Sequence, residues 1–183
     1  MEQDGIMIIV FAALAAFFGL WYLWLQKKGS TPDELSAYKT LMPEMLASLP
    51  REKVVSAVAA NILAKMDKRR PDVLRVFPLI SPERCQVYSM WLTVNEWNAN
   101  GAKGFAKHVH CDVALIAADG FAACGAPECA AAMEDLAAHR PKEELTQEQC
   151  EAREQAFSAA IAAENPLGKA AEFVMGDIER FCD

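Results

Sequence analysis

Residues 81–94 read SPERCQVYSMWLTV, and this stretch predicts how the main part of the chain folds. Ser81 is a favoured helix N-cap residue, and Pro82 stands at the first helical position, where a missing backbone N–H costs little. The apolar residues that follow recur at helical spacing and share one face: Val87, Met90, Trp91 and Val94. The stretch therefore predicts a helix that buries one side.

Similar signals occur on both sides of this helix. Alanine is abundant, and prolines and glycines separate stretches that favour helix, while no hairpin signal or repeat is present. The predicted helices span 31–48, 50–70, 81–97, 105–123, 128–140, 146–164 and 167–181. Residues 72–80 favour either a short helix or an extended segment, residues 98–104 favour a loop, and a break near Gly120 is an alternative within 105–123. The fold class expected for this part of the chain is all-α, with short connections.

A second apolar stretch, residues 6–25, reads IMIIVFAALAAFFGLWYLWL and carries no charge. A bilayer core about 30 Å thick is spanned by about 20 apolar residues in a helix. The residues expected to hold the span at the membrane interface are Trp21, Tyr22, Trp24, Lys27 and Lys28. The sequence thus predicts a single N-terminal transmembrane helix in a membrane anchor (1–28), followed by a compact multi-helix soluble domain (29–183).

A cleaved signal peptide and a buried core helix are the alternatives for this stretch. The preceding residues carry Glu2 and Asp4 but no cation, and no small-residue cleavage site follows. The apolar run also exceeds the roughly 7–15 residues of a signal sequence. An uncleaved helix is favoured, and Lys27 and Lys28 orient it with the soluble domain in the cytoplasm. The expected location is the inner (cytoplasmic) membrane, with the lipid bilayer as a partner.

Charge is distributed unevenly along the chain. The whole sequence has a formal net charge of −7 and a pI near 5.0. Residues 85–183 hold seven Lys and Arg against sixteen Asp and Glu. Such a surface repels phosphate, which argues against direct binding of nucleic acid. The six cysteines fit either three disulfides in a secreted chain or reduced thiols in the cytoplasm, and the predicted orientation favours reduced thiols.

Carboxylates are densest where the helix 146–164 begins. Glu144, Glu148 and Glu151 follow one another at i, i+4 and i+7, so they form one stripe of a helix. A stripe of this kind attracts a basic protein partner. The simpler alternative is a solvated face with acidic residues near a helix N-terminus, where they stabilise the helix.

No catalytic, cofactor-binding or metal site is predicted, and the chain is not expected to be an enzyme. His108, His110, Cys111, Cys124 and Cys129 are the residues considered for a metal site. Buried thiols and surface histidines explain the same residues, and the two later cysteines lie among apolar alanines. No motif for a nucleophile or a phosphate-binding loop is present.

Polar residues gather after the helix that starts at Ser81: Asn95, Glu96, Asn98, Asn100 and Gly101. They are consistent with a polar binding pocket at a helix end. They also fit a helix C-terminus followed by an Asn-Gly turn, since both residues tolerate left-handed backbone.

Two segments resemble the DNA-mimic-protein-like family, a bacterial all-α domain of formerly unknown function. They are SPERCQVYSMWLTVNEWNANGAKGFAKHV (81–109) and ALIAADGFAACGAPECAAAMEDL (114–136), and the similar region extends over about 81–183. Residues in places similar to the family's helix and its Asn-Gly-Gly-Phe turn are Tyr88, Asn95, Glu96, Asn100, Gly101 and Phe105. The chain departs from that turn at Ala102, which replaces the second glycine, and at 103–104, which are inserted. The resemblance implies an all-α fold and an acidic surface that imitates DNA and occupies a DNA-binding protein.

Three hypotheses follow. The first is a membrane-anchored, non-enzymatic domain that binds a protein partner, basic or DNA-binding, through an acidic surface. The second is a DNA mimic that sequesters a DNA-binding protein. The third is a metal-binding or hydrolytic enzyme. A homodimer is a further assembly compatible with the sequence.

Overall fold

The computed structural model describes residues 37–66, 72–138 and 146–183, and the chain divides into units 1–37 and 38–183, of which the second is described below. Its helices are α3 (Pro43–Ser48), α4 (Arg51–Lys65), α5 (Pro82–His108), α6 (Cys111–Ala123), α7 (Pro127–Ala138), α8 (Gln147–Glu164) and α9 (Pro166–Gly176). The 3-10 turns are η1 (Val73–Arg75), η2 (Phe77–Leu79) and η3 (Ile178–Phe181). The described residues contain no strand, so the all-α prediction is confirmed.

The predicted fold class also included a membrane-spanning helix, and the structure corrects this part. None of the helices in the described ranges is long and apolar enough to cross a membrane. The longest, α5, has 27 residues but carries charged side chains such as Glu83, Arg84 and Glu96. The predicted span (6–25), its interfacial residues Trp21, Tyr22, Trp24, Lys27 and Lys28, and the boundary at 28/29 lie outside the described residues.

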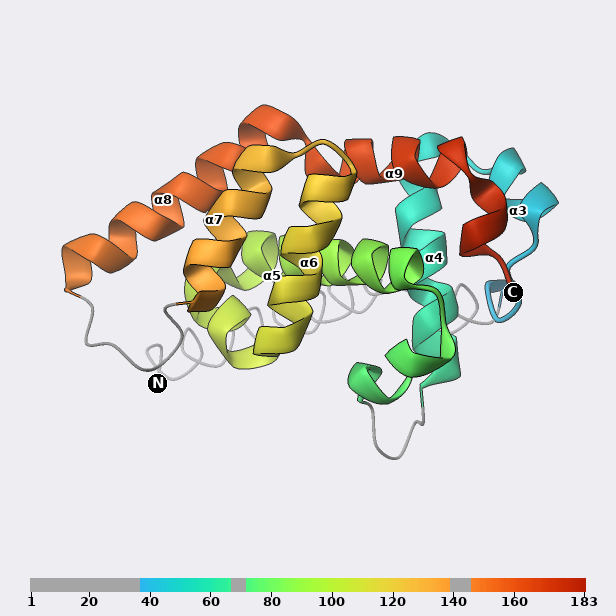
Figure 1. Ribbon diagram of the computed structural model, residues 1–183, viewed down its shortest axis with the longest axis horizontal. Helices are drawn as coiled ribbons and strands as arrows, with labels where there is room; N and C mark the ends of the chain where they lie inside the picture. Colours follow the sequence, from blue (N-terminus) through green and yellow to red (C-terminus); the bar gives the residue numbers. More distant parts are fainter. Residues whose placement is uncertain (1–36, 67–71, 139–145) are drawn as a thin grey trace, which may run out of the picture. The chain divides into compact units, whose positions relative to one another are not determined.

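Helix α5 packs against α4, α6, α9 and η3. Helix α6 contacts one half of α5, α7 lies beside α6, and α8 packs on α7, while α4 and α9 contact the other half of α5 (Figure 1). The turn between α6 and α7 reverses the chain at Gly125, whose φ of +79° suits glycine. The predicted helix end at Gly125 and restart at Pro127 are therefore confirmed.

Aromatic side chains join three of these helices in the core. Trp97 of α5 meets Phe157 of α8 edge to face, with ring centroids 4.9 Å apart, and meets Phe105 at 5.7 Å. Phe121 of α6 lies 6.1 Å from Phe157. The indole Nε1–H of Trp97 donates to Ser158 Oγ at 3.0 Å, which satisfies the one polar atom of the ring.

The predicted helix 31–48 is wrong over residues 38–42. The structure places a turn and extended backbone there, and α3 starts only at Pro43. Proline disfavours helical backbone in the residue before it, and Met42 accordingly has φ −101° and ψ 149°. The predicted start at 31–34 lies outside the described residues, as does the predicted end of the next helix at 67–71.

Most of the predicted loop at 98–104 is wrong, because α5 continues to His108 and Gly101 is the residue of this stretch with non-helical backbone. The Asn-Gly pair forms a kink within α5, where Gly101 has φ 62° and ψ −165°. A further break, which the sequence did not predict, falls at Val109–His110, where neither glycine nor proline stands. The alternative break near Gly120 is wrong as well. A Cβ there would lie 2.8 Å from Met90 Sδ, so this glycine allows α6 to approach α5.

The remaining boundaries follow local sequence signals closely. Thr146 caps α8 with a capping box, in which Gln149 N–H donates to Thr146 Oγ1 and Thr146 N–H donates to Gln149 Oε1. The ambiguous residues 72–80 form the turns η1 and η2. The last predicted helix, 167–181, instead ends at Gly176 and continues as η3.

Candidate functional site

The predicted acidic stripe lies on the solvent-facing side of α8. Glu148, Glu151 and Glu154 are exposed, whereas Phe157 and Ala160 are buried. At about 100° per residue, Glu148 and Phe157 are separated by nine residues, which is about half a turn apart around the helix. Glu148 and Glu151 therefore face away from the core, whereas Glu154, three residues before Phe157, lies on the flank of the helix. Glu144, the first residue of the predicted stripe, lies outside the described residues.

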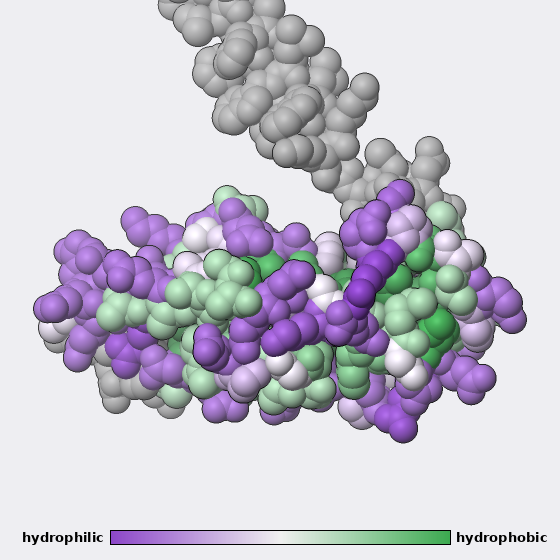
Figure 2. All heavy atoms as spheres, turned by 90° about the horizontal axis from the view of Figure 1, so that it is seen from above, coloured by the Kyte–Doolittle hydropathy of each residue, from purple (hydrophilic) through white to green (hydrophobic). Residues whose placement is uncertain are grey.

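Little positive charge offsets these carboxylates. Arg153 is the one Lys or Arg in the sequence of α8, and its Nε–H lies 2.8 Å from Asp135 Oδ2 of α7. Gln147 Nε2–H donates to Glu151 Oε1 at 2.7 Å, which orders the stripe without neutralising it. Figure 2 looks onto the side that carries α8 and α9, and hydrophilic residues gather at the end where α8 begins. We call Glu148, Glu151 and Glu154 the α8 acidic face.

The structure brings together only part of the predicted turn. Glu96 Oε2 accepts hydrogen bonds from Asn100 Nδ2 at 2.9 Å and lies 3.1 Å from His108 Nδ1. This small cluster spans the kink and links its two helical segments. Asn95 instead donates to the carbonyl of Trp91 at 2.7 Å, and Phe105 is buried in the core. Glu96, Asn100 and His108 therefore stabilise a kinked helix, whereas Asn95 lines a hollow between α4, α5 and α9.

The residues considered for a metal site do not converge. In the described part of the chain, no three His, Cys, Asp or Glu side chains gather closely enough to hold an ion. His110 Nδ1 accepts from Asp112 N–H and caps α6, whereas Cys111 Sγ donates to the Ala137 carbonyl at 3.9 Å. Burial raises the pKa of the Cys124 thiol to about 11 and that of Cys129 to about 12. These thiols act as small apolar groups.

Glu164 has a structural role that the sequence did not indicate. Its carboxylate accepts from the backbone N–H of Cys129 at 2.8 Å and of Glu128 at 3.3 Å, at the N-terminus of α7. Burial alone raises the pKa of Glu164, but these hydrogen bonds and nearby Lys169 outweigh burial, so the pKa is lowered. An acidic residue 35 positions away thus caps α7, which no local pattern would reveal.

A hollow between α4, α5 and α9 has a volume of about 830 Å³. Its walls combine apolar side chains of Val55, Trp91 and Leu167 with two ion pairs, Arg51–Glu172 and Lys169–Glu164. Each cation of the hollow already faces a carboxylate of the same walls. Glu52 adds a third carboxylate to the walls, so the hollow carries more negative than positive charge.

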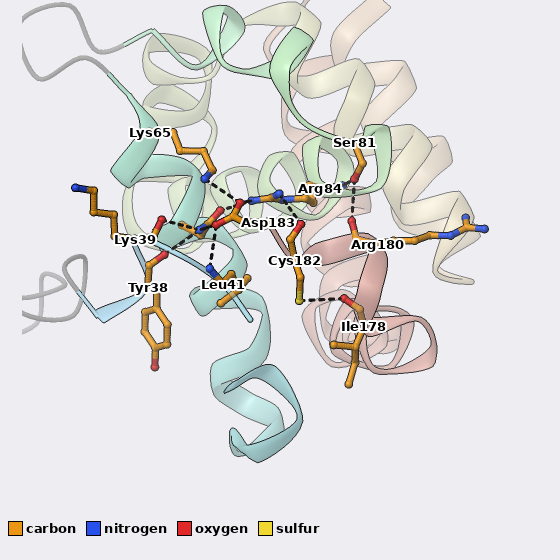
Figure 3. Close-up of polar contacts among 11 residues, drawn as sticks. Tyr38, Lys39, Leu41, Lys65, Ser81, Arg84, Ile178, Arg180, Cys182 and Asp183 are labelled. Atoms are coloured by element: carbon orange, nitrogen blue, oxygen red, sulfur yellow. Dashed lines mark hydrogen bonds and ion pairs between the residues drawn. The ribbon is translucent and has the colours of Figure 1, made fainter. Parts of the chain in front are cut away.

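A cluster of charged and polar side chains fastens the residues 182–183 to the rest of the domain (Figure 3). One carboxylate, that of Asp183, accepts from Leu41 N–H (2.9 Å), Asn61 Nδ2 (2.9 Å), Lys65 Nζ (2.8 Å) and Arg84 Nη2 (3.0 Å). Asp183 N–H in turn donates to the Leu41 carbonyl at 3.0 Å. We call Asn61, Lys65, Arg84 and Asp183 the Asp183 cluster.

Further hydrogen bonds extend this cluster. Asn61 Nδ2 also donates to the carbonyls of Tyr38 and Lys39, and its Oδ1 accepts from Arg84 Nη2. Arg84 Nη1 donates to the Cys182 carbonyl at 3.0 Å. Burial by itself raises the pKa of Asp183, but the donors outweigh it and hold that pKa well below its usual range. The cluster therefore keeps an ionised carboxylate against a guanidinium that is only 6% exposed.

Models of known protein families, curated proteins and solved structures were compared with the chain, and none matches it. The resemblance to the DNA-mimic-protein-like family stays a prediction.

Proposed function

We propose that this domain is a non-enzymatic protein-interaction domain whose α8 acidic face binds a basic protein partner. The observation that carries the proposal is the exposure of Glu148, Glu151 and Glu154, of which Glu148 and Glu151 point away from buried Phe157 and Glu154 lies on the flank of α8. The single cation of that helix is directed to Asp135, so the three carboxylates keep their charge toward solvent. Charge of one sign on a rigid helix raises the rate at which an oppositely charged surface docks.

The packing of α8 supports the same assignment. Its last turns are anchored by Phe157 and Ala160, whereas residues 146–156 are exposed apart from half-buried Cys150 and Arg153. A partner would therefore meet a helix that is already folded and capped. Pre-ordering lowers the entropic cost of binding.

Affinity capture with the full chain tests the proposal. The α8 variant used as bait would carry Glu148→Gln, Glu151→Gln and Glu154→Gln. The matched control would carry Glu52→Gln, Asp119→Asn and Glu179→Gln, which remove the same charge from other exposed positions. Each exposed charge pair contributes about 0.2–1 kcal/mol, so the α8 variant should bind the purified partner about 3–150 times more weakly. The control should bind like the natural sequence, and raising the salt should weaken both.

Two outcomes would contradict the proposal: equal binding of the α8 variant, or binding that does not depend on salt. Adding duplex DNA to the purified complex addresses the DNA-mimic alternative. Release of the partner by DNA would favour a mimic that occupies a DNA-binding surface, whereas a complex that survives excess DNA would favour a basic partner of another kind.

A further inference from the structure

The dipeptide Asn100–Gly101 lies at the kink of α5, where two helical segments meet. Both residues are exposed, and nothing lies within 4 Å of the position that a Cβ on Gly101 would occupy. The backbone of Gly101 is not helical, with φ 62° and ψ −165°. The dipeptide therefore lies in open surroundings at a point where the regular helix is interrupted.

This combination favours a reaction of the asparagine side chain with its own backbone. The amide carbon of an asparagine can be attacked by the backbone nitrogen of the next residue, and glycine hinders the attack least because it has no Cβ. The attack requires rotation about the Cα–C bond of the asparagine, which an uninterrupted helix opposes. A boundary between two helical segments opposes this rotation less, so the kink leaves Asn100 free to react.

The four other asparagines of the chain lack this combination. Asn61 is fully buried. Asn95 and Asn98 are exposed on α5, but each precedes a residue that has a Cβ and regular helical backbone. Asn165 precedes a proline, whose nitrogen carries no hydrogen. Asn98 is the closest match to Asn100, because it is exposed and lies two positions away on the same helix.

We propose that Asn100 is a site of spontaneous deamidation. The backbone nitrogen of Gly101 bonds to Asn100 Cγ and gives up its proton, the Cγ–Nδ2 bond breaks, and the leaving nitrogen takes up a proton and departs as ammonia. A water molecule then opens the five-membered succinimide ring at either carbonyl, which leaves aspartate or isoaspartate at position 100. Water is the only co-reactant. The site is independent of the α8 acidic face.

The modification would change the cluster that links the two segments of α5. Asn100 Nδ2 donates to Glu96 Oε2 at 2.9 Å, and the same oxygen lies 3.1 Å from His108 Nδ1. An ionised aspartate at position 100 has no donor, and it places a second negative charge beside Glu96 at i,i+4 spacing, which destabilises a helix. Isoaspartate also lengthens the main chain by one carbon. Both products should therefore loosen the kink.

Peptide mass spectrometry of the full chain during incubation in mildly alkaline buffer tests the site. Each asparagine is followed by the mass gain that corresponds to exchanging ammonia for water. In the folded protein, Asn100 should react at least about tenfold faster than Asn98. The same incubation in urea gives the rates without the fold, and folding should slow Asn100 by less than about tenfold but slow buried Asn61 by more than about a hundredfold.

Ala99→Gly separates the effect of the kink from the effect of the Asn-Gly sequence. This variant creates a second Asn-Gly pair at 98–99, where the backbone is helical. Asn98 and Asn100 of the variant should react at similar rates in urea, whereas in the folded protein Asn98 should react at least about threefold more slowly. The proposal is overturned if folding slows Asn100 tenfold or more, or if Asn98 of the folded variant reacts as fast as Asn100.

Asn100→Asp reproduces one product and tests its effect on the kink. Amide hydrogen exchange of residues 102–108 should become at least about threefold faster than in the natural sequence. Asn98→Asp adds the same charge at the neighbouring exposed position and should leave that exchange unchanged. Equal exchange in the two variants would contradict the predicted loosening.

Discussion

The Asp183 carboxylate accepts hydrogen bonds from four groups that lie on three separate stretches of the chain. Removing an acceptor from such a partly buried site leaves its donors without a partner, and the buried Arg84 guanidinium loses its counter-charge. Unpaired buried charge is among the strongest destabilising effects known for single substitutions. The contribution of this one residue to stability can therefore be measured directly.

Asp183→Asn should lower the free energy of unfolding at pH 7 by about 2–4 kcal/mol. The carboxyl has a lower pKa in the folded chain than in the unfolded one, where it is about 3.9. Its stabilisation is therefore fully present above that value and is lost as the pH falls toward the folded value. Urea unfolding should show the natural sequence and the variant converging below about pH 4. Asp177→Asn, at an exposed ion pair, is the control and should cost less than about 1 kcal/mol.

Cys129 should resist alkylation in the folded protein. Burial raises the pKa of this thiol to about 12, and its side chain is fully buried, so neither the thiolate nor access is available at pH 8. Mass spectrometry after iodoacetamide treatment should find Cys129 unmodified in buffer and modified in urea. Rapid native modification would show that the α7 N-terminus opens frequently.

Side chains whose roles are local were predictable from the sequence, and those whose roles depend on distant contacts were not. The predicted helix start at Thr146 is correct, and the capping partner of Thr146, Gln149, is only three residues away. Asp183 and Glu164 gave no such signal, since their partners lie up to 142 and 36 residues away. Exposure of Glu148 and Glu151 followed from helical periodicity, but Lys65 and Leu79 line one hollow that only the tertiary fold creates.

At the level of single elements, the kink of α5 depends on one glycine. Gly101 has φ 62° and ψ −165°, a backbone conformation that other residues rarely adopt. Gly101→Ala should therefore destabilise the domain by about 1–3 kcal/mol, although nothing lies within 4 Å of the added Cβ. The midpoint of thermal unfolding measures this effect.

Gly176→Ala provides the comparison for the kink. Gly176 ends α9, its φ is not positive, and an added Cβ again meets nothing within 4 Å. This substitution should change stability by less than about 1 kcal/mol, or increase it slightly, because alanine restricts the unfolded chain. Equal effects of the two substitutions would argue against backbone strain at Gly101.

Helix boundaries were correct where the chain carries its own stop and start signals. The Gly125–Pro127 turn and the N-terminus of α5 at Ser81 are examples. The errors at 38–42 and 98–104 have tertiary causes. Asn61 and Asp183 bind backbone groups of residues 38–41 and hold them out of a helix, whereas packing of Trp97 and Phe105 keeps α5 helical on both sides of its kink.

For the whole molecule, the aromatic core shared by α5, α6 and α8 is the part that couples the helices. Phe157 is fully buried and contacts both Trp97 and Phe121. Phe157→Ala should reduce the free energy of unfolding by about 3–5 kcal/mol, because it removes apolar contact and leaves a cavity. Circular dichroism should show a single unfolding transition at a lower urea concentration than for the natural sequence. Phe157→Leu should cost less, since it restores most of the volume.

The contact between Leu41 and Asp183 joins residues that are 142 positions apart, so it encloses nearly the whole domain in one loop. Closing so long a loop has a high entropic cost, and the neighbouring helix pairs can form earlier from short-range contacts. Late-forming contacts control how fast a protein unfolds and affect the folding rate little. In stopped-flow experiments, weakening the contact between Leu41 and Asp183 should raise the unfolding rate constant and leave the refolding rate constant almost unchanged.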